Sequence, residues 1–280
     1  MTTMPMTRLP DGTMIAQLGQ GTWQMGESAH RRAEEVKALR LGLDLGMSVI
    51  DTAEMYASGA SEEVVGEAIA GRRNEVYLVS KVLPQNSSAK GTVAACEKSL
   101  KRLKTDRLDL YLLHWRGSYA LTETLQGFLA LQKAGKIRHF GVSNFDVEDM
   151  EEWVKLSGGD KVAANQVVYS LRRRGIEYDL IPWQAQRKIP VMSYSPLDQG
   201  RLISSRDLAA VAARHNATPA AVALAWTMRD PIVFTIPKAG SETHVRENHA
   251  ALKIKLTKED FAQLDRAFPP PSRKRPLESI

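Results

Sequence analysis

Cysteine and long apolar runs are what this sequence of 280 residues has least of. Its one cysteine, Cys96, allows no internal disulfide and no cysteine-based metal cluster. Cys96 falls within a predicted helix, where a small core residue is expected rather than a nucleophile. No apolar run approaches the roughly 20 residues of a membrane span, and the first residues lack the apolar stretch of a signal peptide. The sequence therefore predicts a cytosolic protein without a membrane segment.

Glycine-rich phosphate loops and a strong excess of charge of one sign are also missing. An open dinucleotide-binding sheet would carry Gly-x-Gly-x-x-Gly, whereas Gly19, Gly21 and Gly26 have a different spacing. The 38 basic and 32 acidic residues are interspersed, except for the basic runs at 172–174 and 273–275. This balance favours a solvated surface, or a site for an anionic cofactor, over binding to nucleic acid.

What the chain does contain is a regular alternation of strand-like and helix-like segments. The predicted strands begin near residues 18, 48, 76, 108, 137, 162, 189 and 232. The predicted helical stretches span 32–45, 61–70, 92–103, 121–134, 147–156, 178–186, 207–228 and 257–268. The stretch 207–228 holds two helices, the second with Thr218 as its N-cap and Pro219 at its first position. Such βα alternation implies a parallel sheet with right-handed crossovers. Asp11-Gly12 predicts a hairpin turn before the first unit. We expect one domain over residues 1–280: an α/β (β/α)8 barrel, with an N-terminal β-hairpin across its bottom and two extra helices.

Several apolar runs end on, or just before, a polar residue that suits acid–base chemistry. Asp51 follows the run 47–50, Tyr56 comes five residues later, Lys81 follows 76–80 and His114 follows 108–113. Taken singly, each is more often a solvated, capping or core residue. In a barrel, however, the carboxyl ends of the strands surround one pocket. Polar groups gathered there would be costly to desolvate without one another as partners.

Together these four residues describe a tuned proton donor. The ammonium of Lys81 is expected to stabilise the phenolate of Tyr56 and so lower its pKa from the reference value near 10. Asp51 would keep Lys81 charged, and His114 would position a substrate oxygen. The set contains no covalent nucleophile, and no cluster of His, Asp and Glu has metal-ligand spacing. Such a proton donor suits the reduction of a carbonyl group, and because none of these residues can act as the reductant, the reductant must be a cofactor.

At this point the sequence resembles the aldo-keto reductase family over almost its whole length. The matching segments are Gly21-Thr22-Trp23, Asp51-Thr52-Ala53-Glu54-Met55-Tyr56, Ser80-Lys81, Leu112-Leu113-His114-Trp115, Gly141-Val142-Ser143-Asn144-Phe145, Asn165-Gln166-Val167, Ser193-Tyr194-Ser195-Pro196-Leu197 and Ile236-Pro237-Lys238. The resemblance implies NADPH-dependent reduction of aldehydes and ketones on a (β/α)8 barrel. It implies Asp51, Tyr56, Lys81 and His114 as the catalytic tetrad, with Tyr56 as general acid.

The resemblance also implies a cofactor site. Ser143, Asn144 and Gln166 would hold the nicotinamide carboxamide, Tyr194 would stack on its ring, and 238–248 would hold the adenosine end. Many members carry a serine and an arginine where this chain has Ala239 and His244, which leaves NADH possible beside NADPH. The implied cofactor-binding residues are Gly21, Thr22, Trp23, Asp51, Ser143, Asn144, Gln166, Tyr194, Ser195, Pro196, Leu197, Gln199, Lys238, Ala239, His244, Glu247 and Asn248.

The substrate implied is a small carbonyl compound. The nearest resemblance is to bacterial members that reduce methylglyoxal and related 2-oxoaldehydes, and Trp23, Tyr56, His114 and Trp115 would line the pocket. The run Arg172–Arg174 either flanks the mouth or forms a solvated basic loop. A monomer or weak oligomer is expected. Two alternatives remain: a cofactor-binding regulatory or sensor protein with little turnover, and a phosphate-binding barrel enzyme, for which a glycine-rich loop is missing.

Overall fold

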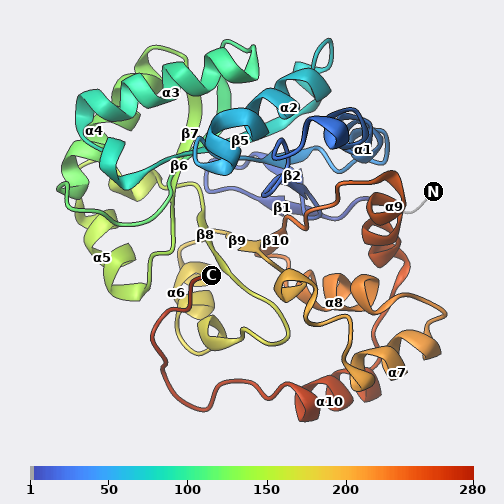
Figure 1. Cartoon of the computed structure of the whole chain (residues 1–280). Helices are drawn as coiled ribbons and strands as arrows, with labels where there is room; N and C mark the ends of the chain where they lie inside the picture. The colour runs from blue at the N-terminus through green and yellow to red at the C-terminus, as the bar shows by residue number, and fades with distance from the viewer. Residues whose placement is uncertain (1–2) are drawn as a thin grey trace.

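A computed structural model describes residues 3–280 and shows a closed barrel of parallel strands surrounded by helices (Figure 1). Each strand is hydrogen-bonded to the next in chain order. Bridges from Leu18 to Thr235 and from Gly21 to Lys238 join the first strand to the last. The barrel strands are β3 (Gln20–Gly21), β4 (Val49–Asp51), β5 (Tyr77–Val82), β6 (Leu108–Leu113), β7 (Ile137–Ser143), β8 (Asn165–Val168), β9 (Val191–Tyr194) and β10 (Val233–Thr235). The predicted (β/α)8 barrel is confirmed.

Ten α-helices are described within residues 3–280. They are α1 (Arg32–Asp44), α2 (Ala60–Ala68), α3 (Ala89–Leu103), α4 (Leu121–Lys133), α5 (Val147–Lys155), α6 (Leu180–Gln186), α7 (Arg206–Arg214), α8 (Pro219–Thr227), α9 (Glu242–Ala250) and α10 (Lys258–Ala267). Eight of them follow the barrel strands, while α7 and α10 pack against each other outside this ring (Figure 1). These two are the predicted extra helices. Within the described residues, no helix is both long enough and apolar enough to cross a membrane.

The sequence explains where most helices begin. The Ser88 side chain accepts a hydrogen bond from Gly91 N and starts α3, three residues earlier than predicted. Thr218 caps α8 and Pro219 takes its first position, as expected. The segment 207–228 holds two helices, as predicted, and the chain turns between Arg214 and Thr218. The strand predicted near 162 begins at Asn165, after a 3-10 turn at Gly159–Lys161.

The predicted hairpin lies at the amino-terminal end of the barrel strands, opposite the loops that lead from the strands into the helices. It pairs β1 (Met6–Arg8) with β2 (Met14–Ala16), and Gly12 in its turn has φ +90°, a conformation that favours glycine. Asp11 in the turn bonds His139 Nε2 at 2.9 Å, and His139 Nδ1 bonds the hydroxyl of the buried Tyr77 at 2.9 Å. This polar chain ties the hairpin to β5 and β7.

The Asp11 carboxylate predicts an acid-sensitive contribution to stability. Partial burial opposes ionisation, but hydrogen bonds from Thr13 and His139 outweigh it and lower the pKa of Asp11 from 3.8 to about 2. A depressed pKa stabilises the fold above the unfolded value and loses that effect as pH falls towards 2. Asp11→Asn should therefore lower the free energy of unfolding by about 1 kcal/mol near neutral pH. In denaturant titrations this difference should shrink below pH 3.8; a difference independent of pH would contradict the ionic explanation.

Candidate active site

A cavity of about 1010 Å³ opens at the carboxyl ends of the barrel strands. Asp51 ends β4, Ser143 ends β7 and Tyr194 ends β9, so the strands present these side chains at one mouth. The sequence-predicted residues that line the cavity are Gly21, Thr22, Trp23, Asp51, Tyr56, His114, Trp115, Ser143, Asn144, Gln166, Tyr194, Ser195, Pro196, Leu197, Gln199, Lys238, His244, Glu247 and Asn248. Lys81 is fully buried and does not itself line the cavity. Ala239 packs in the core with Leu18 and Val245 and is not part of the lining.

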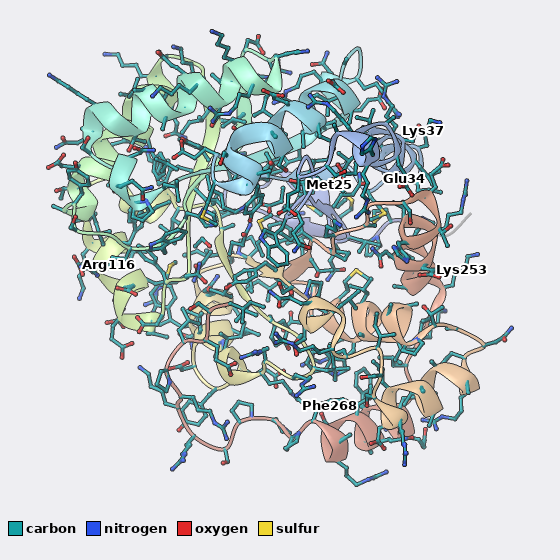
Figure 2. The ribbon with its side chains drawn as sticks, viewed as in Figure 1. Met25, Glu34, Lys37, Arg116, Lys253 and Phe268 are labelled. Carbon is teal, nitrogen blue, oxygen red and sulfur yellow. The ribbon has the colours of Figure 1, made fainter. Side chains whose placement is uncertain are left out.

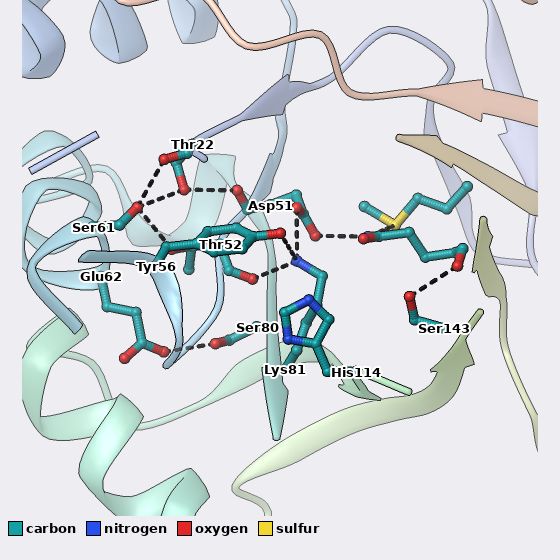
Figure 3. A network of polar contacts seen from close by, with 12 residues as sticks. Thr22, Asp51, Thr52, Tyr56, Ser61, Glu62, Ser80, Lys81, His114 and Ser143 are labelled. Carbon is teal, nitrogen blue, oxygen red and sulfur yellow. Dashed lines mark hydrogen bonds and ion pairs between the residues drawn. The ribbon is translucent and has the colours of Figure 1, made fainter. Parts of the chain in front are cut away.

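Lys81 is the centre of the site's polar network (Figure 3). Its side chain has 0% exposure, and its ammonium donates to Asp51 Oδ2 at 2.8 Å, to the Thr52 carbonyl at 2.8 Å and to the Tyr56 hydroxyl at 3.1 Å. These three bonds use every proton of the ammonium. Because the Tyr56 oxygen accepts from Lys81, the phenol keeps its own proton free to donate to a group in the cavity.

The electrostatics of this network correct one expectation. Burial raises the pKa of Tyr56 above its usual 10, and the lowering effect of Lys81 is smaller. The predicted net lowering is therefore wrong, since sequence reasoning included the charge of Lys81 but not the desolvation of the phenol. Desolvation opposes the charge on Lys81, yet Asp51 and Tyr56 outweigh it and raise the pKa of Lys81. Burial also raises the pKa of Asp51, against the effect of Lys81. At neutral pH the phenol is protonated and the ammonium is charged.

His114 faces Tyr56 across the cavity. The two ring centroids lie 5.8 Å apart, with the planes nearly perpendicular. Burial, assisted by the charge of Lys81, lowers the pKa of His114 to about 2, so the imidazole is neutral at physiological pH. A neutral imidazole keeps one N–H that can donate to a ligand oxygen.

A second group of polar side chains adjoins Asp51. Gln166 Nε2 donates to Asp51 Oδ1 at 2.8 Å, and Ser143 Oγ donates to the Gln166 carbonyl at 2.9 Å. The Tyr194 hydroxyl donates to Asn144 Oδ1 at 3.0 Å. Asn144 has φ +58°, a conformation uncommon for a residue with a side chain. Such strain at a cavity wall is typical of a binding site.

Sequence reasoning missed the layer that supports these residues. The Ser61 hydroxyl bonds the hydroxyls of both Thr22 and Thr52, and Thr22 also donates to the Asp51 carbonyl at 2.9 Å (Figure 3). Beside Lys81, Ser80 donates to the fully buried Glu62 at 2.6 Å. Glu62 lies in the acidic first turn of α2, where a carboxylate also suits the helix terminus. A paired buried carboxylate has no sequence signal of its own, because its partner Arg102 lies 40 residues away.

The basic run and the end of the chain also take defined places. Arg173 pairs with Asp198 and Glu278, and Arg174 is buried against Glu177 and Asp265, so these two do not form a solvated basic loop. Arg172 is exposed and lies near Asp198. Residues 277–280, at the end of the C-terminal tail, line the cavity. Arg116, at the edge of Figure 2, lines the mouth and pairs with Asp149 and Glu152 of α5.

Known proteins resemble this chain over almost its whole length. The model of the aldo/keto reductase family matches residues 17–268, and the chain belongs to this family. It is therefore an oxidoreductase. It is 50% identical to the methylglyoxal reductase YeaE of Escherichia coli (strain K12) over 95% of each chain. It is 35% identical to the glyoxal reductase of Bacillus subtilis (strain 168), covering 92% of this chain and 91% of that one. A solved aldo-keto reductase from Klebsiella pneumoniae, in complex with NADPH, is 49% identical with a TM-score of 0.97, over 99% of this chain and 100% of that one.

Proposed function

We propose that this protein reduces small aldehydes and 2-oxoaldehydes to alcohols, with NADPH as its cofactor. The observation that carries the proposal is the bond from Lys81 to the Tyr56 oxygen, which leaves a protonated phenol in the cavity. Membership of the family and the names of the relatives support the same reaction. The cytosolic location and the monomeric or weakly oligomeric state expected from the sequence stay predictions.

The described residues fit a dinucleotide cofactor. Asn248 is 3% exposed and lines the cavity, and its side-chain nitrogen has no hydrogen-bond partner within residues 3–280. A buried amide nitrogen of this kind requires an acceptor from a ligand or a water. Ser143, Asn144 and Gln166 would hold the nicotinamide carboxamide and Tyr194 would stack on its ring, while 238–248 would hold the adenosine end. When bound, NADPH supplies the hydride.

Tyr56 donates its proton to the carbonyl oxygen as that oxygen gains negative charge. The charge of Lys81 stabilises the phenolate that remains, and Asp51 holds Lys81 in place through the 2.8 Å ion pair. The neutral imidazole of His114 donates a hydrogen bond to the same carbonyl oxygen and orients it. A positioned acid of this kind typically contributes ~10²–10⁴-fold to the rate.

The substrate end of the cavity is walled by two solvent-exposed tryptophans. Trp23 and Trp115 line it and are 41% and 36% exposed. Such walls contact little of a substrate beyond its carbonyl group. An activated carbonyl needs less binding energy from remote groups to reach the transition state. We therefore propose 2-oxoaldehydes such as methylglyoxal as the preferred class.

A substrate panel tests the proposal. Oxidation of NADPH, followed by its absorbance, should be at least about 10-fold faster in kcat/KM for methylglyoxal, phenylglyoxal and nitrobenzaldehyde than for sugars and steroids. Removal of residues 270–280 should change this order more than the affinity for NADPH, because residues 277–280 line the cavity. A steroid as the best substrate would contradict the proposed pocket. Tight NADPH binding without turnover on any carbonyl would instead support the sensor alternative.

A further inference from the structure

Two positively charged side chains meet beside Gly240. A Cβ atom added at Gly240 would lie 2.8 Å from Arg31 Nη2 and 3.3 Å from Lys238 Nζ, so both nitrogens approach the same point. Gly240 is outside the left-handed backbone region. Glycine is therefore not needed here for a special backbone conformation. Its lack of a side chain instead leaves space for the two cations.

Neither cation has a carboxylate partner. Within residues 3–280, no salt bridge involves Arg31 or Lys238, whereas the adjacent Arg32 pairs with Glu63 and Glu67. The acidic Glu35 is already engaged by the amide of Gly26 at 2.9 Å. Partial burial and the charge of Arg31 lower the pKa of Lys238, although nearby glutamates oppose this effect. Two like charges held this close are unfavourable unless an anion lies between them.

The two residues come from opposite ends of the chain. Arg31 ends the 3-10 turn η1 (Ala29–Arg31) before α1, and Lys238 follows β10. They meet because α1 and α9 pack against each other where the barrel closes (Figure 1). Lys238 lines the cavity together with His244, Glu247 and Asn248 of α9. Lys238 thus stands at the end of the cavity that would hold the adenosine, and Arg31 lies beside it, just outside the lining.

We propose that Arg31 and Lys238 together bind the 2′-phosphate of NADP(H), and that Arg31 supplies the fixed positive charge that His244 does not. This inference rests on the proposed function and assigns its cofactor selectivity to a residue outside segment 238–248. A guanidinium can donate two parallel hydrogen bonds to a phosphate, while an ammonium acts as a point charge. NADH has no 2′-phosphate and would leave both cations without a partner.

Direct binding measurements on the full chain test the inference. Quenching of tryptophan fluorescence gives the Kd of NADPH and of NADH for the wild-type protein, Arg31→Ala and Arg246→Ala. Arg246 is the matched control, since it is an exposed arginine on α9 that, unlike Arg31, contributes none of the atoms nearest to Gly240 beside Lys238. Arg31→Ala should weaken NADPH by about 10- to 100-fold and NADH by less than about 2-fold. Arg246→Ala should change both by less than about 2-fold.

A second measurement needs no nicotinamide. By calorimetry, adenosine 2′,5′-bisphosphate should lose affinity in Arg31→Ala by the same factor as NADPH, while adenosine 5′-monophosphate should not. Equal losses for NADPH and NADH, or equal effects of Arg31→Ala and Arg246→Ala, would overturn the role of Arg31. NADPH binding and turnover that are unchanged in Arg31→Ala would overturn it as well, while leaving the proposed function intact. A wild-type protein that bound neither cofactor would instead refute the proposed function.

Discussion

Tyr56→Phe is expected to lower kcat for methylglyoxal by about 10²-fold or more. The substitution removes only the hydroxyl that accepts from Lys81 at 3.1 Å and carries the proton for the carbonyl oxygen. The phenyl ring still fits beside His114, so the shape of the cavity is kept. The Kd of NADPH should change little, because no contact with the cofactor is assigned to the phenol. Stopped-flow or steady-state NADPH oxidation measures the effect.

A matched control for this prediction is Tyr119→Phe. Tyr119 is 40% exposed and does not line the cavity, so the loss of its hydroxyl should leave kcat unchanged within about 2-fold. Wild-type turnover in Tyr56→Phe would remove Tyr56 from its role as the acid. Equal losses in both variants would indicate a general effect on folding.

Lys81→Met should damage both activity and stability. It removes the charge that stabilises the Tyr56 phenolate, so kcat should fall by about 10²-fold or more. It also leaves Asp51 buried without a cation, which typically costs about 3–5 kcal/mol in the free energy of unfolding. Denaturant titration and NADPH oxidation measure the two effects. The exposed Lys37 of α1 (Figure 2) provides the control Lys37→Met, which should leave both quantities close to wild type.

The stability loss in Lys81→Met should depend on pH. Burial already raises the pKa of Asp51, and removal of Lys81 takes away the effects that oppose this. An acid whose folded pKa lies above its unfolded value destabilises the fold increasingly as pH rises, so the loss should be smaller in acid than near neutral pH. The double variant Asp51→Asn with Lys81→Met should recover part of the stability and none of the activity. Recovery of activity in the double variant would contradict a catalytic need for the ammonium.

The fold could be predicted because its signals are local. Apolar runs such as 108–113 mark buried parallel strands, and capping residues such as Thr218 mark where helices begin. The errors lie where local signals are weak. The strand expected near 162 starts later because a 3-10 turn precedes it, and α3 starts earlier because Ser88 accepts from a backbone amide.

From local pattern alone, the candidate site was most predictable where a residue stands at or next to the end of a strand. Asp51 ends β4, Lys81 is the next-to-last residue of β5 and His114 directly follows β6, so the barrel itself brings them to one site. Arg31 has no such mark in the sequence, since it meets Lys238 only after the barrel closes. The pKa of Tyr56 was misjudged for a related reason: the extent of burial depends on packing between distant segments, and no neighbouring residue in the sequence reports it.

The polar chain from Asp11 through His139 to Tyr77 lies at the end of the barrel opposite the cavity. Substitutions there act on the strength of the scaffold without contact to the reacting groups. An engineer could therefore diversify the hairpin and the strand starts to gain thermal tolerance, and separately diversify the loops after the strands to change what is reduced. Because the two sets of residues lie at opposite ends of the barrel, their effects should combine almost additively.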